Sequence, residues 1–504
     1  MNGKSDTQKV PVQELVVGIV APVGANLSLV HDVIDSEFER LGYNTQRVRV
    51  SSLLHQLEEF SDLEATAEGP EFERIRRHMQ AGTELRSKTG QGDIMAMLAV
   101  AKIQQIREAN HGNEVAQEDR ATTPLNRIVY VLRSLKHPDE IRTLRDVYGD
   151  AFIVLSVYVP REERVKTLSE VLAVSENDSD ASKYRSKAEE LIKIDETEEG
   201  NKLGQNVSDA FPLGDLFVDA RSREQVEENL RRFLEALFGF PYHSPTRDEL
   251  GMYLASAAAM RSADLSRQVG AAITTREGEV LALGANEVPK YGGGLYWYGD
   301  KGDSRDFHKG YDSNVKFKRE IVSEIVARLR QGGWLSSEKS AKSVAELTKE
   351  LINNPHEDIL GDAQITNLLE FGRSVHAEMA AITDAAKRGV AIQGATLYTT
   401  TFPCHLCARH IISSGISRVV YVQPYPKSQT ERLYVDSVAV DPSAEVKDRI
   451  HFEPFVGIAP RRYRSLFAHT GKRKDSTSGK ILSWSASSAV PNIRVFVYAY
   501  LTGC

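Results

Sequence analysis

Two hydrophobic patterns alternate along the first half of the chain. Short apolar runs at ELVVGIV, NTQRVRVS, RIVYVL, AFIVLSVYV and DLFVDA predict strands. The segments between them carry apolar residues at helical spacing, as in SLVHDVIDSEFERLG, DIMAMLAVAKIQQIREAN, DEIRTLRDVYG and REQVEENLRRFLEALFG. Strands separated by helices predict βαβ units, and hence a mostly parallel sheet with helices on both faces. The segment 175–204, rich in Ser, Asp, Glu and Lys, is predicted to be an exposed excursion.

The pattern breaks at FGFPYHSPTRDE and then resumes differently. A helix of small residues, ELGMYLASAAAMRSA, precedes a predicted hairpin that turns at Glu277 and Gly278. Further on, HAEMAAITDAAKRG and CHLCARHIISSG predict helices, and ATLYTTTF and RVVYVQPY predict strands. The organisation predicted is therefore an α/β domain at 1–240 and a second domain at 241–504. The second domain contains a long insert at about 290–372, with helices around Glu320 and Glu346.

Composition narrows the class of protein. The 504 residues are 41% hydrophobic and 26% charged, which is ordinary for a soluble globular protein. The net charge of -7 lacks the broad basic footprint of a duplex-binding protein. One local basic cluster is either a solvated face or a contact for phosphate or RNA. Its members are Arg461, Arg462, Arg464, Lys472, Arg473 and Lys474.

The cysteine count and the apolar runs bear on location. Three cysteines, one of them Cys504, cannot build a disulfide framework, which favours a reducing compartment. The N-terminal segment has no apolar core of signal-peptide length, and no run reaches the roughly 18 apolar residues of a spanning helix. We therefore expect a cytoplasmic protein without a membrane partner.

Two short motifs carry the chemistry. His376 is followed two residues later by Glu378, and Pro403 precedes Cys404 and Cys407. This His-x-Glu and Pro-Cys-x-x-Cys pattern is a known signature of zinc deaminases. One imidazole and two thiolates give Zn²⁺ three ligands and leave the fourth tetrahedral position open for water, whose pKa the metal lowers. Glu378 is predicted to move protons between that water, the ring nitrogen and the leaving ammonia.

The Cys-x-x-Cys pair has two other possible roles. The pair could be half of a structural zinc site, or a redox pair. A structural site needs a fourth ligand, and no second cysteine pair exists. His405 or His410 could supply one, but neither accounts for the His-Ala-Glu motif upstream. The pattern favours a catalytic site.

The segments around these motifs resemble a known family. SRQVGAAI, LALGAN, VHAEMAAI and LYTTTFPCHLCARHIISSGISRVVYV make residues 250–425 similar to the deoxycytidylate deaminase branch of the cytidine deaminase superfamily. The resemblance implies an α/β/α sandwich with a mixed five-stranded sheet and metal ligands at two helix N-termini. It also implies a sugar contact from Asn286, and base or phosphate contacts from Tyr425 and Lys427. Ala380 stands where the family commonly has Asn, and GANEVP replaces the regulatory GYNG.

Over nearly its full length the chain resembles bacterial antiviral deoxycytidine nucleotide deaminases. GQNVSDAFPLGDLFVDA and PYPKS belong to this resemblance. It implies an N-terminal P-loop kinase-like domain and the conversion of free dCTP and dCMP to dUTP and dUMP, which depletes dCTP during infection. It also implies control by a small RNA or a nucleotide effector, and a homo-oligomer.

The N-terminal loop departs from a functional phosphate-binding motif. Gly18 and Gly24 lie between a predicted strand and helix, where a phosphate-binding loop would stand. Ala25 and Asn26 occupy the positions of the usual lysine and hydroxyl residue. The glycine turn could still offer backbone N–H groups to an anion. We therefore expect a degenerate domain that senses nucleotides or binds protein or RNA.

Two further hypotheses remain open from the sequence. The deaminase could act on a base in RNA or single-stranded DNA, using the basic cluster and aromatic residues of the insert such as Trp297. Alternatively, the P-loop-like half could be the working part, as a kinase or sensor, with a secondary deaminase.

Overall fold

The computed structural model describes residues 14–65, 69–198, 201–352, 359–360, 363–425, 428–442, 446–469 and 471–493. The chain divides into two compact units. Unit 1 consists of Met1–Glu249 and Pro454–Cys504, and unit 2 of Leu250–Glu453. No helix in the described ranges is both long and apolar enough to cross a membrane.

Unit 1 contains a six-stranded sheet of order β12-β5-β4-β1-β3-β2. All described pairings in this sheet are parallel except that of β12 with β5. The first five strands confirm the predicted parallel arrangement. The strands are β1 (Leu15–Val20), β2 (Asn44–Arg49), β3 (Ile128–Arg133), β4 (Phe152–Tyr158), β5 (Leu216–Asp219) and β12 (Gly457–Ile458).

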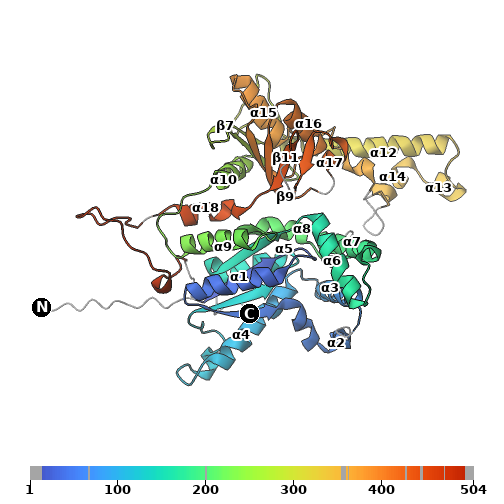
Figure 1. Ribbon diagram of the computed structural model, residues 1–504. Helices are drawn as coiled ribbons and strands as arrows, with labels where there is room; N and C mark the ends of the chain where they lie inside the picture. The colour runs from blue at the N-terminus through green and yellow to red at the C-terminus, as the bar shows by residue number, and fades with distance from the viewer. Residues whose placement is uncertain are drawn as a thin grey trace. The chain divides into compact units, whose positions relative to one another are not determined.

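Helices cover the sheet of unit 1. They are α1 (Leu27–Arg40), α2 (Asp62–Ala65), α3 (Glu71–Thr89), α4 (Ile94–Asn110), α5 (Pro138–Tyr148), α6 (Arg161–Ser175), α7 (Arg185–Glu196), α8 (Val207–Ala210), α9 (Arg223–Leu237) and α18 (Pro460–Phe467). Helices α1 and α9 lie side by side and share a core with alternate residues of β1, β3 and β4 (Figure 1). The intervening strand residues are buried as well, as expected for a parallel sheet covered on both faces.

The segment 175–204 is not the exposed excursion that its composition predicted. It contains α7, whose Ala188, Leu191 and Ile192 are fully buried against α6. The charged residues that dominate the composition occupy the outer face of this helix, so the apolar stripe is narrow. Asp195, also fully buried, accepts hydrogen bonds from Val23 N at 2.7 Å and from Lys136 Nζ at 2.7 Å.

The C-terminal residues return to unit 1, whereas the sequence placed them in the second domain. Strand β12 pairs with β5, and Ile458 joins the core of unit 1. Arg461 and Arg462 of α18 both pair with the buried carboxylate of Asp215, and Arg462 itself is only 6% exposed. Two members of the basic cluster therefore pair with a carboxylate of unit 1, and of these two Arg462 is buried whereas Arg461 stays exposed.

Unit 2 contains a second six-stranded sheet, of order β10-β11-β9-β8-β6-β7. β6 pairs antiparallel with β7 and β8, whereas β8 pairs parallel with β9, so the sheet is mixed as predicted. It has one strand more than the five expected. The strands are β6 (Gly270–Thr274), β7 (Val280–Ala285), β8 (Thr396–Thr401), β9 (Arg418–Gln423), β10 (Val438–Val440) and β11 (Ile450–Pro454).

The helices of unit 2 confirm the predicted ones and add short segments. They are α10 (Arg247–Ala259), α11 (Asp306–Lys309), α12 (Ser313–Gln331), α13 (Ser337–Ala341), α14 (Val344–Ile352), α15 (Ala377–Arg388), α16 (His405–Ser413) and α17 (Thr430–Leu433). The insert forms a small core of its own where α12 and α14 pack together (Figure 1). Helix α15 lies over β6 and β7.

One glycine sets the distance between α15 and the sheet. A Cβ added at Gly284 of β7 would stand 2.1 Å from the carbonyl oxygen of Ala377 and 2.5 Å from the backbone nitrogen of Ala381. Only glycine lets the strand approach the first turn of α15 this closely. That turn follows His376 directly, so the contact fixes the height of the histidine above the sheet.

A buried histidine in unit 1 gives a pH prediction. His31 of α1 is 3% exposed, and burial, with the charges of Arg47 and Arg133, lowers its pKa to about 4. The unfolded chain binds this proton near pH 6.5, so the native state loses stability as the pH falls from about 6.5 toward 4. At pH 5 we expect a loss of ~2 kcal/mol from this residue.

The measurement is hydrogen exchange of the β1 and β3 amides at pH 7 and pH 5, corrected for intrinsic exchange rates. Between pH 7 and pH 5, the opening free energy of the His31→Leu variant should fall by ~2 kcal/mol less than that of the wild-type protein. An equal drop in both proteins would show that His31 does not titrate on unfolding.

Candidate active site

His376 stands at the start of α15, where it is the N-cap residue. The preceding residue, Val375, exchanges two backbone hydrogen bonds with Glu287, at 3.0 and 3.2 Å. The carbonyl oxygen of His376 accepts the first helical bond, from Ala380 N at 2.8 Å. The histidine backbone is thus held on one side by an extended segment and on the other by a helix.

The two cysteines lie at the start of α16. Cys404 is the N-cap residue and Cys407 lies in the first turn, so both side chains face the same way. Cys404 is 6% exposed and Cys407 is fully buried. The prediction that the ligands occupy two helix N-termini matches this arrangement, in which free backbone N–H groups favour thiolates.

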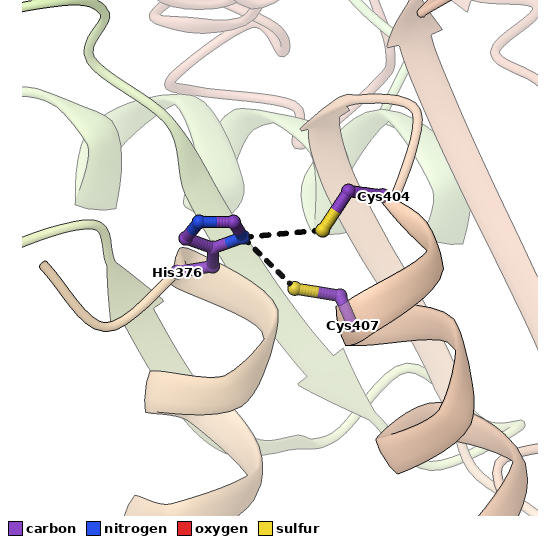
Figure 2. A group of neighbouring side chains, drawn as sticks. All are labelled: His376, Cys404 and Cys407. Atoms are coloured by element: carbon purple, nitrogen blue, oxygen red, sulfur yellow. Dashed lines mark hydrogen bonds between the residues drawn. The ribbon is translucent and has the colours of Figure 1, made fainter. Parts of the chain in front are cut away.

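The imidazole and the two sulfur atoms converge. His376 Nδ1 lies 3.3 Å from Cys404 Sγ and 3.3 Å from Cys407 Sγ, and Figure 2 shows the ring of α15 facing both sulfur atoms of α16. The three candidate ligand atoms all lie within 4.8 Å of one another. In a tetrahedral zinc site, Zn–N and Zn–S bonds of normal length place nitrogen and sulfur ~3.6 Å apart. The set fits Zn²⁺ in both donor type and spacing.

Hydrogen bonds couple the protonation of the trio. The hydrogen bond from Cys407, together with the nearby imidazole, lowers the pKa of Cys404, whereas the same bond and burial raise the pKa of Cys407. The hydrogen bond with Cys404 raises the pKa of His376 to about 9. The protons shared among these groups are the ones that a metal ion displaces when it binds.

Glu378 lies beside the trio without belonging to it. It occupies the first turn of α15, is 4% exposed, and its Oε2 lies 3.4 Å from Cys407 Sγ. Burial raises the pKa of its carboxyl group. No ion pair neutralises it among the described residues, and its predicted role as a proton carrier stays a prediction.

The side-chain amide of Asn286, predicted to contact a sugar, forms hydrogen bonds with the protein's own backbone. Its Oδ1 accepts from Val269 N at 2.7 Å, and its Nδ2 donates to Arg267 O at 2.7 Å. The residue is 8% exposed. The amide therefore holds the 267–269 segment in place, and direct contact with a sugar stays a prediction.

Of the two other predicted substrate residues, Tyr425 and Lys427, the structure describes only Tyr425. Tyr425 is half-buried, and its pKa is raised by burial and by the charge of Cys404 and lowered by that of Arg267. Lys427 lies outside the described residues.

Arg267 is a candidate that the sequence did not single out. It is exposed, its charge acts on Tyr425, and its carbonyl oxygen is fixed by Asn286. No ion pair of its guanidinium is found among the described side chains. In the sequence, Arg267 is marked only by its place in SRQVGAAI, shortly before the strand that begins at Gly270, and many surface arginines lie in such a place.

The glycine loop of unit 1 is built differently from a phosphate-binding loop. Gly18 lies inside β1, where a Cβ would stand 2.7 Å from Leu135, and Gly24 has φ +88° with a Cβ position 2.8 Å from Arg164 O. Ala25 follows, and Asn26 caps α1 by accepting from Leu29 N at 3.4 Å. A carboxylate of the same chain, Asp195, takes the N–H of Val23.

Comparison with known proteins points to the same segment. Residues 245–423 match the family described as the cytidine and deoxycytidylate deaminase zinc-binding region. Over 55 residues the chain is 47% identical to the deoxycytidylate deaminases of Enterobacteria phages T2 and T4, which covers 11% of this chain and 29% and 28% of theirs. It is 39% identical over 71 residues to a probable deoxycytidylate deaminase of Drosophila melanogaster, covering 13% of this chain and 34% of that protein.

These matches define a zinc-binding region rather than a whole enzyme. The chain spans about 29% of the length of the phage relatives. The dCMP deaminase of cyanophage S-TIM5 aligns over 42% of this chain and 100% of its own at 17% identity, with a TM-score of 0.23, an overlap too loose to carry a conclusion. The matched region contains His376, Cys404 and Cys407, so the chain has the residues to bind zinc at this site.

Proposed function

We propose that unit 2 deaminates free deoxycytidine nucleotides by hydrolysis, converting dCMP and dCTP to dUMP and dUTP. The observation that carries the proposal is the convergence of one imidazole nitrogen, two thiols and a buried carboxyl group at the start of two helices. The match to a deaminase zinc-binding region, and segments nearly half identical to phage deoxycytidylate deaminases, support the same reaction.

Each residue has a distinct task in this reaction. His376, Cys404 and Cys407 would hold the zinc ion, which supplies a Lewis acid that makes water nucleophilic near neutral pH. Glu378 takes the proton of the attacking water and delivers it to N3 of the cytosine ring. The same carboxylate then takes the remaining proton from the new C4 hydroxyl group and gives it to the amino group, so the C4–N bond breaks, ammonia leaves and the uracil carbonyl remains. Its burial keeps both transfers away from bulk water.

Free nucleotides are the proposed substrates because of the residues around this centre. Arg267 offers an exposed cation whose charge acts on Tyr425, which suits recognition of a phosphate group. Asn286 fixes the backbone of Arg267, so its contribution would be to hold that cation in place. Lys427 is proposed as a second phosphate contact.

A substrate panel tests the proposal. Purified zinc-loaded protein is given dCMP, dCTP, deoxycytidine and a cytosine-containing single-stranded DNA at equal cytosine concentration, and uracil products are counted. Turnover of the two nucleotides, with deoxycytidine at least tenfold slower for want of a phosphate, is expected. Turnover confined to the DNA would contradict the proposal.

We further propose that unit 1 is a degenerate P-loop-like domain that regulates unit 2 in an oligomer. The parallel sheet with a glycine turn after β1 supports the relationship, while Ala25 and Asn26 in place of Lys and Ser or Thr speak against phosphoryl transfer. The effector would be a nucleotide or a small RNA, and dCTP depletion would serve defence against phage. Measuring dCMP turnover with and without dTTP, ATP or cellular RNA tests the regulatory part.

A further inference from the structure

A buried carboxylate behind the metal histidine has no task in the reaction described above. Glu287 follows Asn286 directly after β7 and is 1% exposed. A charged side chain with so little contact with water is stable only when its oxygens are fully engaged by donors. Its role therefore follows from the residues that supply these donors.

The donors of Glu287 are the next residue of the chain and two other segments. Oε1 accepts from Val288 N at 2.9 Å, and Oε2 accepts from Ala263 N at 3.0 Å. The third partner is Arg305, at the start of the insert helices, whose Nη1 lies 3.5 Å from Oε2. Arg305 also binds Asp303 through Nε at 3.0 and 2.9 Å, so its guanidinium is itself fixed.

The segments held in this way border the metal site. The backbone of Glu287 pairs with Val375, the residue before His376, in both directions. Ala263 begins the stretch that carries Arg267, whose carbonyl oxygen accepts from Nδ2 of Asn286, the residue before Glu287, at 2.7 Å. One side chain therefore joins the strand that supports the metal histidine to the stretch that carries the candidate phosphate contact.

We propose that Glu287 is a positioning residue that sets the distance between His376 and the 263–267 segment. This inference rests on the proposed deaminase function. Glu287 touches neither the substrate nor the metal; it acts through the backbone of Val375 on one side and through the N–H of Ala263 on the other. Because a carboxylate only accepts, all of its partners donate, and a glutamine of the same shape can accept from the donors of only one of the two oxygens.

The Glu287→Gln variant tests this role. Its NH₂ group cannot accept a hydrogen bond, so it either leaves Ala263 N and Arg305 without their acceptor or meets Val288 N, beside the backbone that pairs with Val375. We expect kcat for dCMP to fall roughly tenfold, equivalent to ~1.4 kcal/mol. In the cobalt-substituted protein, the thiolate-to-cobalt absorption bands should shift in position or intensity, because His376 moves relative to the two sulfur atoms.

Glu249→Gln is the matched control. Glu249 belongs to unit 1 and is also fully buried; its carboxylate accepts from Thr246 N at 2.8 Å, from Ile458 N at 2.9 Å and from Arg232. The two variants lose the same kind of bond, so a similar loss of thermal stability is expected. Only Glu287→Gln should change the cobalt spectrum and kcat.

The outcomes separate this inference from the proposed function. An unchanged cobalt spectrum and kcat in Glu287→Gln, with only a lower Tm, would make Glu287 merely structural and overturn the inference. If the wild-type protein does not turn over dCMP, the proposed function fails, whereas the cobalt spectra still test positioning. If Glu287→Gln does not fold, Glu287→Asp keeps an acceptor-only group, and a wild-type spectrum and kcat despite its shorter reach would overturn the inference.

Discussion

The Glu378→Gln variant is expected to bind zinc normally and to lose at least ~10³-fold in kcat for dCMP. A positioned proton carrier contributes typically 10²–10⁴-fold, and Glu378 is asked to serve both the ring nitrogen and the leaving group. Its oxygen lies 3.4 Å from Cys407 Sγ, outside the trio that can hold the metal, so the amide should not disturb the ligands. Zinc content and steady-state kinetics on the same preparation are the measurement.

Glu320→Gln provides the control for this variant. Glu320 lies on α12 with a side chain 55% exposed, so its loss should change neither zinc content nor kcat. Retention of even a tenth of wild-type activity by Glu378→Gln would show that another group moves the protons. Loss of zinc from that variant would instead make Glu378 part of the metal site.

Replacing any ligand of the trio is expected to remove the metal together with turnover. In His376→Ala, Cys404→Ala and Cys407→Ala, two protein ligands remain, which is too few to hold Zn²⁺ in competition with water. We expect less than a tenth of a zinc equivalent per chain and activity at background, measured by elemental analysis and dCMP turnover.

His410→Ala separates a catalytic site from a closed structural one. His410 lies in the last turn of α16, away from the cysteines that begin the helix. Among the described residues only His376, Cys404 and Cys407 form a metal-binding cluster, so His410→Ala should retain a full zinc equivalent. Zinc loss from this variant would indicate a fourth protein ligand, and with it a site that has no room for water.

The metal centre could be predicted from the sequence because its parts are local. Cys404 and Cys407 are three residues apart at a helix start, and His376 and Glu378 are two apart at another. Helix geometry then fixes how the side chains of each pair are directed. Only the approach of α15 to α16 required the tertiary structure.

The substrate side could not be predicted in the same way. Arg267 is one of 63 basic residues, and although it lies in the SRQVGAAI segment, the resemblance assigned it no role. Asn286 could be found from the resemblance, but its hydrogen bonds to residues 267–269 arise only when β6 and β7 pair. The role of Glu287 depends on three segments that are far apart in the sequence.

Two features of unit 1 escaped prediction for different physical reasons. Helix α7 carries so many charged residues that its narrow buried stripe was hidden in the composition. The return of the C-terminal residues rests on β12, which has two residues, and on the pairing of α18 arginines with Asp215. Neither a two-residue strand nor a long-range ion pair leaves a periodic signal.

Hydrolysis of dCMP in water enriched in ¹⁸O tests the central claim most directly. The zinc-loaded wild-type protein should release one ammonia for each dUMP formed, and the new oxygen at C4 should carry the label. Glu378→Gln and the metal-free protein should form neither product. Unlabelled dUMP, or turnover that survives removal of zinc, would contradict a site in which His376, Cys404, Cys407 and Glu378 direct water onto the cytosine ring.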